Sequence, residues 1–214
     1  MKKPLSLTQK TLNIWAIILI VWSVYRANFK LAEWIDELII KPLIFVLPVA
    51  YYIVKVEKTA FLSSIDLKGK LKKADWLISI TIGLLFVFTI ALANYLKNKH
   101  LQFNTAQPIL MIAVLALATG ITEEILSRGF VLKRLYADSK NLWSAAFLSS
   151  ILFFFLHVPM LFSNLKITGN ILLLFMVTDV LLSLVISFVY IERKNLWVAI
   201  LIHAFYNFSL TLLV

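Results

Sequence analysis

Long apolar runs alternate with short basic segments along the chain. A helix needs about 20 apolar residues to cross about 30 Å of hydrocarbon. Three runs of that order contain no acidic residue, Lys or Arg, namely 76–96, 142–165 and 195–214. Four further runs are shorter or contain a few charges, namely 11–25, 38–54, 108–136 and 167–191. The pattern predicts seven membrane-spanning helices, and Pro42 and Pro48 predict a kink in the run 38–54.

An eighth, half-inserted helix is the alternative between residues 28 and 41, where LAEWIDELI is amphipathic. With seven spans and a cytoplasmic N-terminus, fourteen Lys and Arg face the cytoplasm and six, Lys41 among them, face the outer side. Cytoplasmic loops carry the excess of Lys and Arg, so the count favours this orientation. The Lys-rich segment 55–75 is then a cytoplasmic loop.

Composition excludes a soluble protein. The 214 residues are 61% hydrophobic and 15% charged, against about 45–50% and 25% in soluble domains. The net charge of +10 is confined to the short segments between apolar runs, which indicates a lipid surface and no nucleic-acid partner. Cysteine is absent, so disulfides and thiolate metal sites are excluded. The expected fold is an all-α, multi-pass membrane helix bundle in the cell membrane, forming a single membrane domain.

Several ionisable side chains lie inside the predicted spans, where each is costly unless it is paired or hydrated. At about 1.5 Å per residue, four spans deliver these groups to one slab about 10 Å thick. This agreement in depth makes them candidates for a functional site. The residues are Glu123, Glu124, Arg128, His157, Asp179 and His203, with Asn207 beside them.

Helical spacing gives these side chains directions. Glu124 and Arg128 are separated by four residues, so they can form an ion pair on one helix face. Glu123 is turned by about 100° from Glu124, which leaves its carboxylate free to face another helix. His203 and Asn207 share a face in the same way, and Phe153 lies one turn before His157.

A carboxylate, two imidazoles and an amide suit hydrolysis of a carbonyl compound. A buried Glu near a His can act as a general base toward water, and His and Asn donors can stabilise the oxyanion that forms. A zinc ion held by Glu123, His157 and His203 is the alternative. The absence of a His-Glu-x-x-His pattern weakens the zinc version, and a cofactor-free site stays open beside it.

Three motifs resemble those of the CPBP family of intramembrane proteases. Residues 123–128 are similar to its EExxxR motif, 153–157 to FxxxH and 203–207 to HxxxN, in the expected order. That family includes type II CAAX prenyl endopeptidases and bacterial proteins of the lysostaphin-resistance and bacteriocin self-immunity type. The resemblance covers about residues 108–214, the expected protease core, whereas 1–107 match only as generic N-terminal transmembrane helices.

The resemblance implies roles for individual residues. Glu123 and His157 would activate the attacking water, and His203 and Asn207 would form the oxyanion site. Supporting residues would be Glu124 and Arg128. The implied cavity opens toward the cytoplasmic leaflet, and the metal requirement within the family is contested.

Two further residues have roles that rest on their positions alone. Phe153 is expected to pack against His157 one turn further along the helix. Asp179 belongs to none of the three motifs, and it either orients a histidine or lines the cavity.

These observations predict an intramembrane endopeptidase that acts on a membrane-associated peptide or protein. Bacteriocin self-immunity, peptide processing and cleavage of a membrane-bound regulator are equal candidates for its role. A proton-coupled transporter is one alternative, although no inverted repeat is visible. A non-proteolytic immunity protein is another, although it would have no need of charges that are costly to bury.

Overall fold

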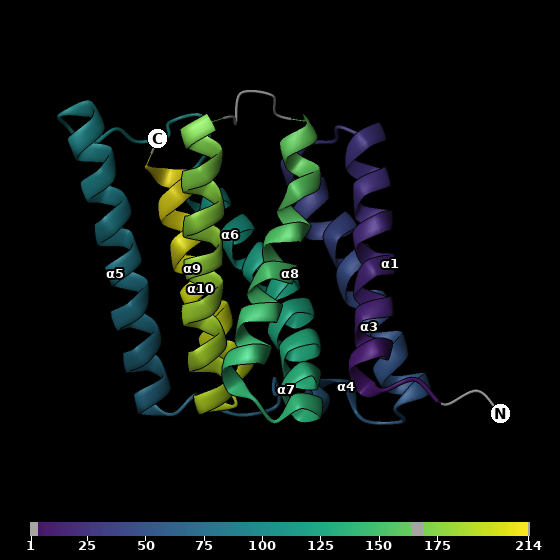
Figure 1. Cartoon of the computed structure of the whole chain (residues 1–214). Helices are drawn as coiled ribbons and strands as arrows, with labels where there is room; N and C mark the ends of the chain where they lie inside the picture. Colours follow the sequence, from purple (N-terminus) through teal and green to yellow (C-terminus); the bar gives the residue numbers. More distant parts are fainter. Residues whose placement is uncertain (1–3, 164–168, 214) are drawn as a thin grey trace.

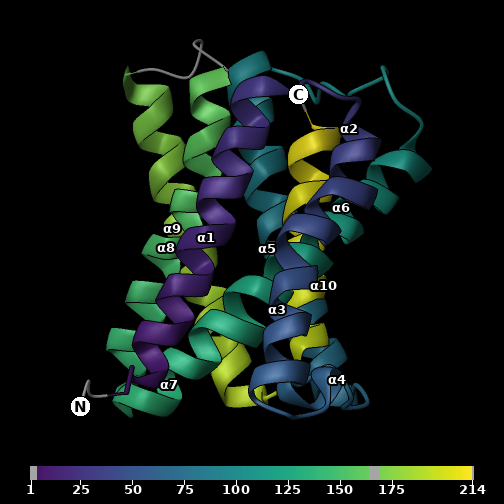
Figure 2. The same cartoon turned by 90° about the vertical axis from the view of Figure 1, so that its right-hand side faces the viewer.

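The computed structural model describes residues 4–163 and 169–213. These residues form a bundle of helices that run up and down roughly along one axis, which confirms the all-α fold (Figures 1 and 2). The α-helices are α1 Leu7–Asn28, α2 Glu33–Ile35, α3 Leu47–Tyr51, α4 Phe61–Ser64, α5 Lys73–Asn98, α6 Ile109–Glu124, α7 Lys133–Ser139, α8 Leu142–Ser163, α9 Gly169–Arg193 and α10 Leu196–Leu212. Four π-helical segments continue them, at Asp36–Ile40, Pro42–Val46, Tyr52–Val56 and Ile125–Leu132.

Within the described residues, six helices are long and apolar enough to cross a membrane. The seventh predicted span corresponds to α10, which is apolar but shorter. Three predicted ends, at residues 165, 167 and 214, lie outside the described residues. The chain is a multi-pass membrane protein.

The second span is one continuous helix over Glu33–Val56. It begins only a few residues after α1 ends, so the amphipathic segment considered as an eighth helix is the first part of this span. Arg26 of α1 pairs with Asp36 at 2.8 Å across the connection. Pro42 begins one of its π-helical segments and Pro48 lies in α3, as expected of residues that cannot donate a backbone hydrogen bond.

Close backbone approaches place α10 beside α5 and α6. A Cβ added at Gly83 of α5 would lie 2.5 Å from the ring of Phe205, and one at Gly120 of α6 would lie 3.1 Å from the Ile200 carbonyl oxygen. Small residues let transmembrane helices approach closely. The last helix is therefore held against α6, which carries the first motif.

The two ends of the bundle differ in charge. The N-terminal end of α1, α4 and α7 lie at one end, and the C-terminus and α2 lie at the other (Figures 1 and 2). The segment between the second span and α5 is docked at the first end by Arg134–Glu57 at 2.5 Å and Lys133–Asp66 at 2.6 Å. We call this the basic end, defined by residues 55–73, 133–140 and 193–194, and the other the C-terminal end.

Candidate active site

A cavity of about 270 Å³ that contains several ionisable side chains lies between the helices of the bundle. Its lining includes five of the residues that the sequence singled out, from four different helices: Glu123, His157, Asp179, His203 and Asn207. The four helices α6, α8, α9 and α10 thus bring these side chains to one place, as their common depth predicted.

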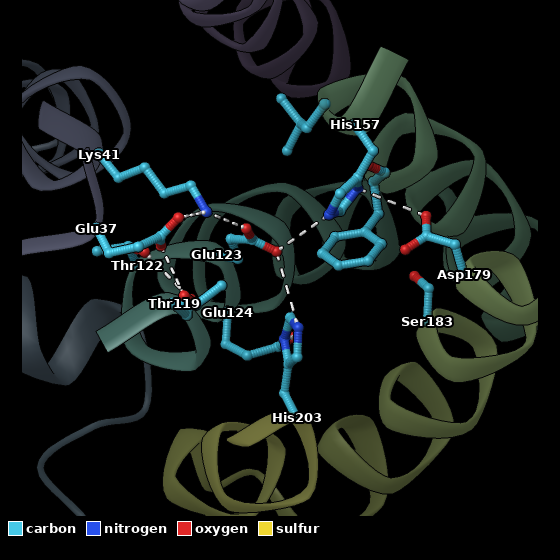
Figure 3. Close-up of polar contacts among 12 residues, drawn as sticks. Glu37, Lys41, Thr119, Thr122, Glu123, Glu124, His157, Asp179, Ser183 and His203 are labelled. Carbon is cyan, nitrogen blue, oxygen red and sulfur yellow. Dashed lines mark hydrogen bonds and ion pairs between the residues drawn. The ribbon is translucent and has the colours of Figure 1, made fainter. Parts of the chain in front are cut away.

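Glu123 is at the centre of the site (Figure 3). It is the second-last residue of α6, and only 3% of it is exposed. Its Oε2 lies 3.6 Å from Nε2 of His157 and 3.8 Å from Nε2 of His203. This oxygen is buried and accepts no hydrogen bond within the described part of the chain. The carboxylate therefore has one oxygen that faces both imidazoles and is available to a further donor.

The other oxygen of Glu123 is held by Lys41, which the charge count placed on the outer side. The structure corrects that assignment, because Lys41 is buried within the second span. Its Nζ lies 2.8 Å from Oε1 of Glu123 and 2.8 Å from Oε1 of Glu37. Thr119, one turn before Glu123, donates to Oε2 of Glu37 at 2.6 Å. The four-residue spacing of Glu37 and Lys41 was a signal that could have revealed this network.

His157 is positioned by groups from two helices. Its Nδ1 lies 3.2 Å from the carbonyl oxygen of Phe153 and 3.6 Å from Oδ2 of Asp179. The rings of Phe153 and His157 meet edge to face with centroids 4.9 Å apart. The structure therefore places Asp179 beside His157, and Phe153 beneath the same imidazole, as the sequence suggested for it.

His203 is positioned by Glu124, the second carboxylate of the first motif. Oε1 of Glu124 lies 2.7 Å from Nδ1 of His203 and accepts a hydrogen bond from Arg128 at 2.8 Å. Arg128 also donates to the hydroxyl of Ser183 on α9 at 2.7 Å. Because an ionised carboxylate only accepts, Nδ1 of His203 is the donor, and Nε2 faces Glu123. The predicted ion pair of Glu124 and Arg128 exists, and it also orients a histidine of the site.

Beneath the site, toward the basic end, the bundle is closed by a layer that we call the cavity floor: Leu126, Arg128, Phe130 and Phe153. Each of these four side chains is at most 1% exposed. The Arg128 guanidinium carbon lies 4.6 Å from the ring centroid of Phe153, within range of a cation–π contact. Apolar packing and a paired cation therefore fill the bundle on this side, where none of the four side chains lines the cavity.

The arrangement does not fit a bound divalent metal. Within the described ranges, no group of three His, Cys, Asp or Glu side chains has the placement that a metal ion needs. In addition, the Lys41 ammonium already lies 2.8 Å from the Glu123 carboxylate, where its charge would repel a second cation. The chemistry derived below therefore uses only the side chains.

The fold and the site define a multi-pass, all-α membrane protein with a buried Glu–His site. The family model described as "Rce1-like: Type II CAAX prenyl endopeptidase Rce1-like" matches residues 105–209. This match supports the resemblance to the CPBP family and a CAAX-type membrane endopeptidase. It spans α6 to most of α10 and leaves Lys41 outside. The searches of the curated proteins and of the solved structures gave no match.

Proposed function

We propose that the protein is an intramembrane endopeptidase that hydrolyses a peptide bond with a water molecule activated by Glu123 and His157. The observation that carries the proposal is the position of Glu123 Oε2, which lies within 4 Å of imidazole nitrogens from two other helices. A general base must be within hydrogen-bond reach of its water, and this oxygen has no other partner among the described residues.

In the proposed reaction, a water molecule between Glu123 and His157 gives a proton to the carboxylate. Its oxygen forms a bond to the carbonyl carbon of the substrate, and the carbonyl oxygen becomes an oxyanion. Nε2 of His203 and the side-chain amide of Asn207 donate to that oxyanion. Since Nδ1 of His203 donates to Glu124, His203 fills this role in its doubly protonated form. The C–N bond then breaks, and the proton held by Glu123 passes to the leaving amine.

The remaining polar residues are positioning residues in this scheme. Glu124 and Arg128 hold the ring of His203, and Asp179 lies beside Nδ1 of His157. Lys41 fixes one oxygen of Glu123, which leaves the other for water. The substrate class is a peptide or protein segment close to the membrane, in bacteriocin self-immunity, peptide processing or cleavage of a membrane-bound regulator.

Purified protein in detergent and a fluorogenic peptide library test the proposal. Glu123→Gln removes the base, and loss of a general base lowers rates about 10²–10⁴-fold. We expect losses of the same order in His157→Ala and His203→Ala. Glu192→Gln, at an exposed carboxylate of α9, is the matched control and should retain the parental rate. Parental cleavage by Glu123→Gln would refute the mechanism.

A chelator separates the side-chain mechanism from the zinc alternative. Because the site residues do not fit a divalent metal, we expect prolonged treatment with EDTA to leave the cleavage rate unchanged. Inactivation by EDTA with recovery on adding zinc would show that a metal performs the activation of water.

A further inference from the structure

The cavity has its mouth at the C-terminal end of the bundle. Four of its lining residues lie where helices begin or end on that side: Arg26 near the end of α1, Glu33 at the start of α2, and Leu210 and Thr211 near the end of α10. Glu33 and Leu210 are exposed, whereas Glu123 and His203 deeper in the cavity are at most 3% exposed. Exposure thus increases from the site toward this end.

Depth along the helices leads to the same conclusion. At about 1.5 Å per residue, His157 lies about 9 Å from the last residue of α8 and about 22 Å from the first. Asn207 lies about 8 Å from the last residue of α10 and about 16 Å from the first. Both of these ends are at the mouth, so His157 and Asn207 are nearer to it than to the basic end.

The opposite route is closed by the cavity floor. The side chains of Leu126, Arg128 and Phe130 are fully buried there, and Ile65 packs against Gly129 from the docked segment. A peptide that enters the site along the axis of the bundle therefore comes from the C-terminal end.

Basic residues are unevenly divided between the two ends. The described Lys and Arg at the C-terminal end, apart from the buried Lys41, are Arg26, Lys30, Lys97 and Lys99. Those at the opposite end are Lys10, Lys55, Lys58, Lys68, Lys70, Lys72, Lys73, Lys133, Arg134, Lys140, Arg193 and Lys194. Because the side rich in Lys and Arg stays in the cytoplasm, the basic end is the cytoplasmic one.

We propose that the cavity opens to the outer, extracytoplasmic side of the membrane and receives its ligand there. The orientation stands on the geometry of the cavity and on the distribution of Lys and Arg between the two ends; that the ligand is a cleavable peptide rests on the proposed function. The proposal replaces the expectation of a cavity that opens toward the cytoplasmic leaflet. That expectation and a cytoplasmic N-terminus cannot both hold, because the mouth is lined by residues at the C-terminal end of the bundle. The N-terminal end of α1 lies at the opposite end (Figure 2).

The surroundings of the mouth indicate the kind of segment that would enter. Phe29, Leu31 and Trp34, in and just after the connection between α1 and the second span, are each at least 45% exposed. Aromatic side chains at the end of a span favour the headgroup level of the bilayer. The rim is polar, with Arg26 and Glu33, and the lining below it includes Phe45, Ile112 and Leu115. The ligand class is therefore an extended, partly apolar peptide segment that lies at the outer membrane surface.

The absence of cysteine allows a direct test of the orientation. Three single-cysteine variants report on three places: Glu33→Cys on the rim, Ala116→Cys in the cavity wall and Lys68→Cys at the basic end. In intact spheroplasts, a small membrane-impermeant methanethiosulfonate should modify the first two, and it should modify Lys68→Cys only after permeabilisation. The reverse pattern would overturn the proposal. So would an Ala116→Cys that becomes reactive only after permeabilisation.

A second experiment separates this inference from the proposed function. Proteoliposomes of the Lys68→Cys variant are sorted by orientation, by capturing those vesicles in which this cysteine faces outward. A peptide that the detergent-solubilised protein cleaves is then added outside the vesicles. Vesicles with the C-terminal end outward should cleave it, and those with the basic end outward should not. Cleavage only by the second population would overturn the inference. If no peptide is cleaved even in detergent, the proposed function fails, and the cysteine labelling alone decides the orientation.

Discussion

Removal of the Lys41 ammonium is the most informative perturbation of the site. Lys41→Met keeps much of the side-chain volume and leaves Glu37 and Glu123 without their shared cation. Each carboxylate oxygen lies 2.8 Å from Nζ, so the two oxygens are within about 6 Å of each other. At that distance two unit charges repel by about 3 kcal/mol with an effective dielectric constant of 20.

The stability cost follows from burial. The side chains of Lys41, Glu37 and Glu123 are 10%, 14% and 4% exposed, and removing one partner of a buried ion pair costs about 3–5 kcal/mol. At about 2–4 °C per kcal/mol for a domain of this size, Lys41→Met should lower Tm by about 6–20 °C. Thermal unfolding in detergent, followed by circular dichroism, measures the shift.

A double variant isolates the electrostatic part. Glu37→Gln in the Lys41→Met background removes one of the two facing carboxylates, so it should recover part of the lost Tm. The single variant Glu37→Gln keeps the Lys41–Glu123 pair and should lose less than Lys41→Met. If the double variant is no more stable than Lys41→Met, repulsion between carboxylates is not the cause and the reasoning is wrong.

Two further predictions concern the packing around the site. Arg128→Met removes the guanidinium that pairs with Glu124 in a fully buried position and leaves only His203 beside that carboxylate, so we expect a loss of about 3–5 kcal/mol in unfolding experiments, with Arg128→Lys retaining more stability than Arg128→Met. Equal stability of the two variants would contradict this. Gly83→Ala introduces a Cβ 2.5 Å from the Phe205 ring and should cost about 1–3 kcal/mol, whereas Gly69→Ala, with 3.7 Å to its nearest neighbour, should be close to neutral.

Much of the fold follows from hydropathy, because a bilayer accepts only segments whose backbone groups are satisfied internally. The run 76–96 became α5 with small shifts at both ends, since an apolar run defines the core of a span better than its caps. The run 142–165 begins where α8 begins, and its predicted end lies outside the described residues. The amphipathic segment 28–41 was ambiguous, because its division into an apolar and a polar face fits both an interfacial helix and the polar start of a span that faces a cavity.

The site was partly predictable for a local reason. Glu124 with Arg128 and Phe153 with His157 are separated by a single helical turn, so the sequence alone indicates their contact. Lys41 was missed because a lysine near the end of an apolar run resembles a loop residue, and its partner Glu123 is distant in the sequence. The side on which the cavity opens could not be predicted, because it depends on which helices pack tightly across the bundle.

The cavity floor has a consequence for the membrane as well as for the site. A polar cavity that reaches from one surface to the middle of the bilayer shortens the insulating path for ions and protons. Here the remaining path runs through Leu126, Phe130 and Phe153, with the buried positive charge of Arg128 among them. Because Glu124 pairs with this guanidinium at 2.8 Å, the barrier to ions comes from the apolar packing of the layer, in which an unpaired charge is costly. Arg128, which helps to orient His203 through Glu124, therefore also belongs to the dry layer that separates the site from the basic end of the bundle.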